Sequence, residues 1–162
     1  MNGPKAKRRP SLTQARLLRT SRQFLLDTNA FIYFLDGEEP YLSRVLMPLF
    51  ERVQAGQASV IVSVITEAEL LVRPERAGDQ NAIQRISDLL SEPGIEVADV
   101  TRRMARRAAA LRSRNSLKLP DAIIVATAIE TRCDAIIGND QAWAAKPVAV
   151  NYVLLDDVVR AT

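Results

Sequence analysis

Short apolar runs recur along this chain of 162 residues, and each is followed by a segment with helical spacing. The runs at 23–27, 58–65, 94–98, 134–138 and 148–155 have the length and composition of buried strands. Strands that alternate with helices in this way usually pair in parallel. The sequence therefore predicts an α/β fold with a central, mainly parallel sheet of about five strands flanked by helices.

The remaining segments divide into a basic extension and helices of one folded domain. Residues 1–22 hold seven Lys or Arg and no acid, so we expect 1–22 to be a flexible N-terminal extension with a short helix possible in 11–22. The folded domain is expected to span 23–162, a length that suits one core. Helices are expected at 29–36, 43–55, 66–72, 79–91, 101–118, 120–132 and 140–145.

The composition excludes several kinds of chemistry. The chain has no histidine and one cysteine, Cys133, so Ser-His-Asp and Cys-His catalysis, a thiolate zinc site and an internal disulfide are excluded. Its six glycines form no phosphate-binding loop. No apolar run reaches the roughly 18 residues of a membrane span, and no secretory signal is present, so a cytoplasmic location without membrane attachment is expected.

Acidic residues follow the predicted strands. Asp27 ends the first strand, Glu67 and Glu69 follow the second, and Asp140 follows the run at 134–138. Asp121 heads a helix and lies above its apolar stripe. Functional groups of parallel sheets gather beyond the carboxyl ends of the strands, so these acids are expected to lie close together.

Helix capping is the alternative explanation for each acid. Thr66 and Glu69 have the spacing of a capping box, and Asp121 and Asp140 stand where helices are expected to begin. Capping explains the acids one at a time and does not predict that they should meet. Carboxylates that meet repel one another unless a divalent cation lies between them, and a set of oxygen ligands suits Mg²⁺ or Mn²⁺.

A second basic block occupies residues 101–118, with no acid inside it. Five of its arginines share one arc of the predicted helix, opposite an apolar stripe. Such a face is either solvated or attracts an anion such as a phosphate backbone. The residues that would contact such a backbone are Arg102, Arg103, Arg106, Arg107, Arg112, Arg114 and Lys118.

Four segments that contain these acids resemble the motifs of the PIN-domain family, and specifically its VapC-type toxin ribonucleases. They are "LLDTNAFIYFL" with Asp27, "VSVITEAELL" with Glu69, "LPDAIIVATAIE" with Asp121 and "IIGNDQAW" with Asp140. The likeness covers roughly residues 23–157. One departure is Gly138, which stands where the family often has threonine.

The resemblance implies an Mg²⁺- or Mn²⁺-dependent endoribonuclease, the toxin of a type II toxin-antitoxin system. It implies a single PIN-like domain at 23–162, a homodimer and silencing by an antitoxin. Asp27 and Asp121 would be the principal metal ligands, and Glu69 and Asp140 would be ligands or would orient water. Asn29 and Thr66 would position these carboxylates.

Three other functions stay open from the sequence. A catalytically silent module could bind RNA or protein with the same fold. A nuclease of this kind could also act on DNA, which a comparison with a 2′-deoxy substrate would decide. Phosphotransfer on an aspartate needs a second Asp two residues after the first, and Asn29 occupies that position.

Overall fold

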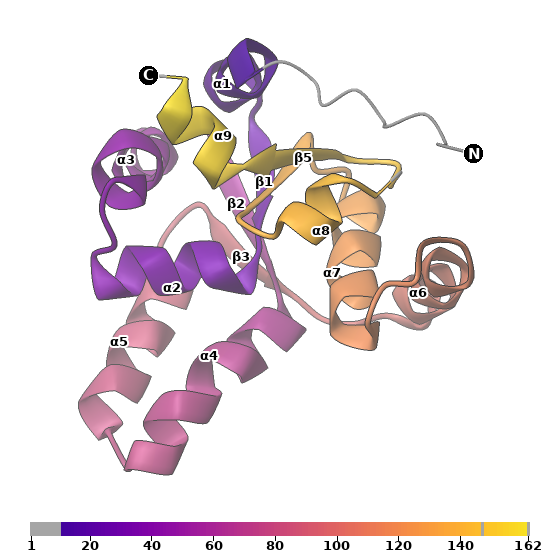
Figure 1. Cartoon of the computed structure of the whole chain (residues 1–162). Coiled ribbons are helices and arrows are strands. Elements are labelled where there is room, and N and C mark those ends of the chain that lie inside the picture. Colours follow the sequence, from indigo (N-terminus) through magenta and orange to yellow (C-terminus); the bar gives the residue numbers. More distant parts are fainter. Residues whose placement is uncertain (1–10, 147, 162) are drawn as a thin grey trace.

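The computed structural model describes residues 11–146 and 148–161. No helix in this part of the chain is long and apolar enough to cross a membrane. The elements, labelled as in Figure 1, are α1 (Ser11–Thr20), β1 (Gln23–Leu26), α2 (Thr28–Asp36), η1 (Leu42–Leu46), α3 (Met47–Gln54), β2 (Ser59–Ser63), α4 (Val64–Ala77), α5 (Gln80–Leu90), β3 (Ile95–Ala98), α6 (Arg102–Asn115), α7 (Leu119–Glu130), β4 (Ala135–Gly138), α8 (Gln141–Ala144), β5 (Asn151–Leu154) and α9 (Leu155–Arg160).

The strands form one sheet of five, in the order β3-β2-β1-β4-β5. Each neighbouring pair is parallel, with Leu25 of β1 opposite Ile61 of β2 on one side and Ile136 of β4 on the other. The predicted α/β class and its parallel sheet are therefore confirmed.

Helices cover both faces of the sheet, as Figure 1 shows with α2 to α5 on one side and α6 and α7 on the other. Side chains alternate along β1: Phe24 and Leu26 join the core beneath α2 to α5, and Leu25 joins the core beneath α6 and α7. Strands buried on both faces need apolar residues at nearly every position, which is why they read as continuous apolar runs.

Three segments differ from their expected form. Helix α4 is longer than the expected 66–72: Ser63 caps it, so that it begins two residues earlier at Val64, and it continues past Pro74 to Ala77. The expected helix at 43–55 is a π-helical turn, η1, followed by α3. Strand β5 ends at Leu154, and a helix that the sequence did not reveal, α9, follows at once with Asp156 and Asp157 in its first turn.

The second half of the basic extension is a docked helix. Buried Gln14 of α1 accepts a hydrogen bond from the Leu154 backbone N–H at 3.0 Å. The Arg52 guanidinium donates to the carbonyl oxygens of Leu18 and, at 2.8 Å, Ser21, where α1 ends. The short helix considered for residues 11–22 is thus present as α1, and residues 1–10 lie outside the described part of the chain.

Candidate metal centre

The candidate site lies at the carboxyl ends of β1 and β4. The strand order turns at this pair, because β2 and β3 follow on one side of β1 and β5 follows on the far side of β4. Asp27 directly follows β1, and its backbone N–H donates to Ile137 of β4 at 2.9 Å. Crevices at such a switch point are the usual ligand sites of parallel sheets.

Asp27 is the most buried of the four predicted acids. It is 9% exposed, and its Oδ1 accepts a hydrogen bond from the Thr28 N–H at 2.8 Å, which caps α2. Burial, followed by the charges of Asp121, Glu69 and Asp140, raises the pKa of Asp27 to about 7. The fold therefore holds the Asp27 carboxyl in surroundings where its negative charge is unfavourable, because the group is buried and three other acids are near it.

Glu69 is exposed on α4 and reaches Asp27 through the start of α2. The Thr28 hydroxyl donates to Glu69 Oε2 and lies 3.4 Å from the hydroxyl oxygen of buried Thr66. Ser63, and not Thr66, caps α4, so the capping-box explanation of Thr66 and Glu69 is wrong. The structure thus connects Thr66 with Glu69 through Thr28.

Asp121 is half-buried in the first turn of α7. Burial raises its pKa, the Trp143 side chain lowers it, and the Asp140 charge raises it. Lys118 and Lys146 are near enough to lower it further. Asp121 is therefore subject both to the charge of another acid and to the charges of two lysines.

Asp140 is exposed and caps the short helix α8. Its Oδ1 accepts hydrogen bonds from the backbone N–H groups of Ala142 at 2.8 Å and Trp143 at 3.2 Å. Its own N–H donates to the Tyr152 hydroxyl at 3.1 Å. Asp140 therefore does cap a helix, as the alternative explanation proposed. It is also near enough to Asp27 for its charge to raise the pKa of that residue.

Gly138 and Tyr152 form a contact that the sequence did not reveal. A Cβ at residue 138 would overlap the Tyr152 hydroxyl oxygen and lie 3.0 Å from Asp27 Cβ. Burial and then the Asp27 charge raise the pKa of Tyr152, so its hydroxyl keeps its proton in the acidic centre. A glycine before the fourth acid is the only visible signal for this contact, because it leaves space for a side chain from another strand.

An amide network fixes the loop after β4. Asn29 Oδ1 accepts a hydrogen bond from the Asn139 N–H at 3.0 Å, and the Asn139 side chain donates to Asp156 at 3.1 Å. Asn139 Oδ1 accepts from the Asp156 N–H at 2.9 Å, and Tyr41 donates to the same carboxylate at 2.6 Å. These hydrogen bonds lower the pKa of Asp156. Asn29 thus acts on the acids through the backbone of the loop that carries Asp140.

The four acids fit a divalent cation in their chemistry and their electrostatics. Asp27 interacts unfavourably with each of the other three, and every ligand atom available from them is an oxygen. Within residues 11–146 and 148–161, no three Asp, Glu, Cys or His side chains are close enough to one another to coordinate a single metal ion.

The basic face of α6 is partly neutralised from outside the segment. Arg103 forms an ion pair with Glu130 of α7 at 2.5 Å, and Arg107 pairs with the same carboxylate. Arg112 donates to the Leu117 carbonyl at 3.2 Å. The exposed cations Arg102, Arg106, Arg114 and Lys118 form no ion pair within the described residues.

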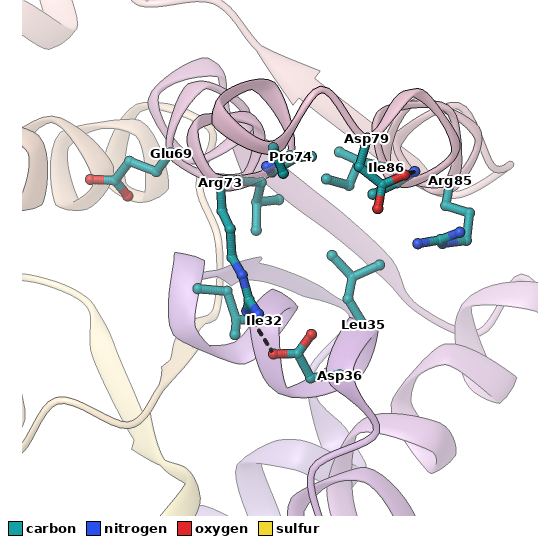
Figure 2. Close-up of a pocket in the computed structure, with 12 residues that line it drawn as sticks. Ile32, Leu35, Asp36, Glu69, Arg73, Pro74, Asp79, Arg85 and Ile86 are labelled. Atoms are coloured by element: carbon teal, nitrogen blue, oxygen red, sulfur yellow. Dashed lines mark hydrogen bonds and ion pairs between the residues drawn. The ribbon is translucent and has the colours of Figure 1, made fainter.

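A groove of about 400 Å³ lies beside the acidic centre, between α2, α4 and α5. Figure 2 shows Glu69 at one end, Ile32, Leu35 and Ile86 in its walls, and the ion pair between Arg73 and Asp36 across it. Ile32 and Leu35 are 40% and 37% exposed, so the groove presents apolar surface to solvent. Asp27, Asp121 and Asp140 are not among its lining residues.

The combination of a five-stranded parallel sheet and an acidic switch point defines a class of single-domain α/β proteins with a carboxylate site. The sequence profile of the PIN domain matches residues 24–148, so this chain belongs to the PIN-domain family. The resemblance found from the four motifs is thereby confirmed. A search of curated proteins found no match.

Solved structures with this fold include a toxin and complexes of toxins with antitoxins. VapBC2 from Rickettsia felis, bound to a promoter DNA fragment, has a TM-score of 0.65 and 18% identity, covering 80% of this chain and 96% of that one. A toxin-antitoxin complex from Klebsiella pneumoniae has a TM-score of 0.61, 28% identity and coverages of 81% and 96%. VapC20 from Mycobacterium tuberculosis, a Sarcin-Ricin loop cleaving toxin, has a TM-score of 0.58, 15% identity and coverages of 75% and 94%.

Proposed function

We propose that this protein is a divalent-metal-dependent endoribonuclease and the toxin of a toxin-antitoxin pair. The observation that carries the proposal is the environment of Asp27, a nearly buried carboxylate whose charged neighbours are three further acids. A structural role does not require this costly arrangement, whereas binding of a cation offsets it. Membership of the PIN family and similarity to solved toxins support the same function.

Asp27 and Asp121 would hold Mg²⁺ or Mn²⁺, with Glu69 and Asp140 as further ligands or as groups that orient water. A bound ion of this kind lowers the pKa of a coordinated water and stabilises negative charge at a scissile phosphate. Thr28 holds Glu69, and the hydrogen bond from Asn139 to Asn29 holds the loop that carries Asp140. These contacts would hold the carboxylates in position for an ion to bind.

The RNA backbone needs attraction from outside the acidic centre. Lys118 and Lys146 lie near Asp121, and Arg102, Arg106 and Arg114 are exposed along α6. Arg103, Arg107 and Arg112 already have protein partners, so they would contribute less to RNA binding than their sequence positions suggest.

The partner in this proposal is a cognate antitoxin. The similar solved structures include toxin-antitoxin complexes from Rickettsia felis and Klebsiella pneumoniae. The apolar groove beside Glu69 offers surface next to the carboxylates for such a partner. We further propose that the protein acts as a homodimer in the cytoplasm.

The experiment that tests this function incubates the purified protein with total RNA and with matched single-stranded DNA. Each substrate is tested with Mg²⁺, Mn²⁺ or EDTA. Discrete RNA fragments that disappear with EDTA are the expected result. Cleavage of DNA in place of RNA would redirect the proposal to a DNA nuclease, and binding without cleavage under both ions would favour a silent RNA-binding module.

A further inference from the structure

Gly138, the last residue of β4, has no side chain for a reason other than its backbone conformation. The other glycines of the described residues all have positive φ, which favours glycine: Gly37, Gly56, Gly78 and Gly94. Gly138 does not, so its backbone would accept other residues. A Cβ here would instead overlap the Tyr152 hydroxyl oxygen and lie 3.0 Å from Asp27 Cβ. Glycine inside a strand often marks such a close approach.

The register of the sheet explains how Tyr152 reaches this space. Tyr152 pairs with Ile136 of β4, and Gly138 follows two residues later on the same face of the sheet. The ring of Tyr152 packs against the core beneath α6 and α7. The phenol extends from there to Gly138, where its hydroxyl oxygen takes the place of a Cβ. Gly138 is therefore the residue that makes room for the Tyr152 hydroxyl beside Asp27.

The hydroxyl oxygen of Tyr152 also holds the backbone of Asp140. It accepts a hydrogen bond from the Asp140 N–H at 3.1 Å. One oxygen atom thus contacts the loop that carries the fourth acid and fills the space beside the first acid. Asp140 is an exposed residue, so water is an alternative acceptor and the N–H does not require a tyrosine. The hydrogen bond from another strand fixes where this acid lies.

The ring of the same tyrosine holds the helix that Asp140 caps. It meets Trp143 of α8 edge to face, with 5.4 Å between the ring centroids, and α8 lies beside β5 in Figure 1. Asp140 Oδ1 accepts hydrogen bonds from the N–H groups of Ala142 and Trp143, so the carboxylate and α8 are tied together. Tyr152 thus restrains this unit twice, through its hydroxyl and through its ring.

We infer that Tyr152 is a positioning residue, whose hydroxyl accepts the Asp140 N–H in the space that Gly138 leaves. It thereby holds Asp140 next to Asp27 for a divalent cation. The inference rests on the proposed function, because it gives Asp140 a role at a metal ion. Groups that orient metal ligands typically change metal affinity by about 10- to 100-fold when they are removed.

The first test measures hydrogen exchange of the backbone amides by NMR in metal-free solution. The Asp140 amide of wild type is expected to be protected. Tyr152→Phe keeps the ring against Trp143 and removes the acceptor, so it should speed exchange at Asp140 about 10-fold. Amides of β1 are the internal control, because a general loss of stability would speed them as well. An Asp140 amide that is unprotected in wild type, or that does not respond to Tyr152→Phe, would overturn the inference.

The second test measures Mg²⁺ and Mn²⁺ affinity by calorimetry, without RNA. Tyr152→Phe should lower both affinities about 10-fold. Thr127→Val is the matched control, because it removes a hydroxyl from a buried residue of α7 that bonds only within its own helix and to Met104. It should leave both affinities unchanged. Wild-type affinity in Tyr152→Phe would contradict the inference.

Two double variants separate the hydroxyl from the space that it fills. Both combine Tyr152→Phe with a new side chain at position 138. Gly138→Ser supplies a hydroxyl that can accept the N–H two residues later, as serine does in tight turns, whereas Gly138→Ala supplies none. Restored metal affinity in the serine variant alone is the expected result, and equal affinities of the two double variants would overturn the inference.

The amide measurement also separates this inference from the proposed function. Wild type that binds neither ion would refute the proposed metal-dependent nuclease. Exchange at the Asp140 amide needs no metal, so it would still decide whether the Tyr152 hydroxyl holds this acid in place.

Discussion

Asp27 and Glu130 are carboxylates of similar burial in opposite surroundings. Asp27 is 9% exposed and has three acids as charged neighbours. The Glu130 side chain is 8% exposed and forms ion pairs with Arg103 and Arg107. The chain therefore has arginines available to neutralise a buried carboxylate, and it places them on α6, next to Glu130 of α7, rather than beside Asp27.

The difference separates a carboxylate that stabilises the fold from one that costs stability. A paired carboxylate fixes two helices against each other, and removing one partner leaves a charge without compensation. An unpaired carboxylate among acids raises the free energy of the folded state until a cation arrives. The five predictions that follow are ordered from the largest expected effect to the smallest, and each treats one side of this comparison.

Asp27→Asn should reduce RNA cleavage by about 10²–10³-fold, because it removes a carboxylate from the centre where charge must be stabilised. The measurement is the initial rate of RNA fragmentation in Mg²⁺ or Mn²⁺. Glu67→Gln on α4 is the matched control and should keep wild-type activity. Equal rates for Asp27→Asn and wild type would remove Asp27 from the site.

The same Asp27→Asn variant should unfold less readily than wild type in EDTA at pH 8. The pKa of Asp27 is about 7 in the folded state and 3.8 as its ordinary value, so the folded state holds the proton more tightly than the unfolded state. Ionisation therefore destabilises wild type as pH rises from about 4 to 7, by up to about 4 kcal/mol. Chemical denaturation at pH 5 and 8 checks this: the advantage of the variant should shrink at pH 5, and a constant difference would contradict the pKa.

Gly138→Ala should lower stability by about 1–3 kcal/mol, since the new methyl group would overlap the Tyr152 hydroxyl. Tyr152→Phe removes that oxygen, so the double variant should recover a large part of the loss. Denaturation of the four proteins in this cycle measures the coupling. Additive effects would show that the two residues do not share the space.

Glu130→Gln should lower stability by about 1–2 kcal/mol, less than for a fully buried pair, because Arg103 is 79% exposed and Arg107 39% exposed in their side chains. Asp134→Asn would be an unsuitable control because Asp134 accepts from two backbone N–H groups. Asp88→Asn, at an exposed position of α5, is better and should have little effect. An equal loss in both variants would mean that the ion pairs of Glu130 contribute nothing specific.

Arg102→Gln with Arg106→Gln should weaken RNA binding a few-fold. The salt dependence of binding should also become shallower, by up to about one unit of slope for each phosphate that the protein no longer neutralises. Arg103→Gln with Arg107→Gln removes the same charge from residues that pair with Glu130. The first pair should therefore have the larger effect on affinity, measured by titration at several salt concentrations. The reverse order would show that pairing with Glu130 does not restrict RNA binding.

The fold could be predicted from sequence patterns, because its strands are buried on both faces and its helices show a regular spacing of apolar residues. The same patterns placed Asp27 and Asp140 at strand ends, and the motifs selected Glu69 over Glu67. The proximity of these acids in the structure agrees with that placement, and their catalytic role stays a prediction.

Contacts between distant segments could not be predicted in the same way. Glu130 lies outside the arginine block that it neutralises, and the Tyr152 hydroxyl reaches Gly138 from another strand. The docking of α1 depends on Gln14 and Arg52, which carry no periodic signal. Contacts of this kind can be identified only once the strands and helices have been placed in three dimensions.

The most direct test of the central claim is thermal unfolding of wild type and Asp27→Asn at pH 8, each in EDTA, Mg²⁺ and Mn²⁺. A ligand that binds only the folded state raises the unfolding temperature. We predict a reversal: the variant is more stable in EDTA, and wild type gains stability with either ion while the variant gains little. Equal responses of the two proteins to the ions would contradict the claim that Asp27 belongs to a metal centre.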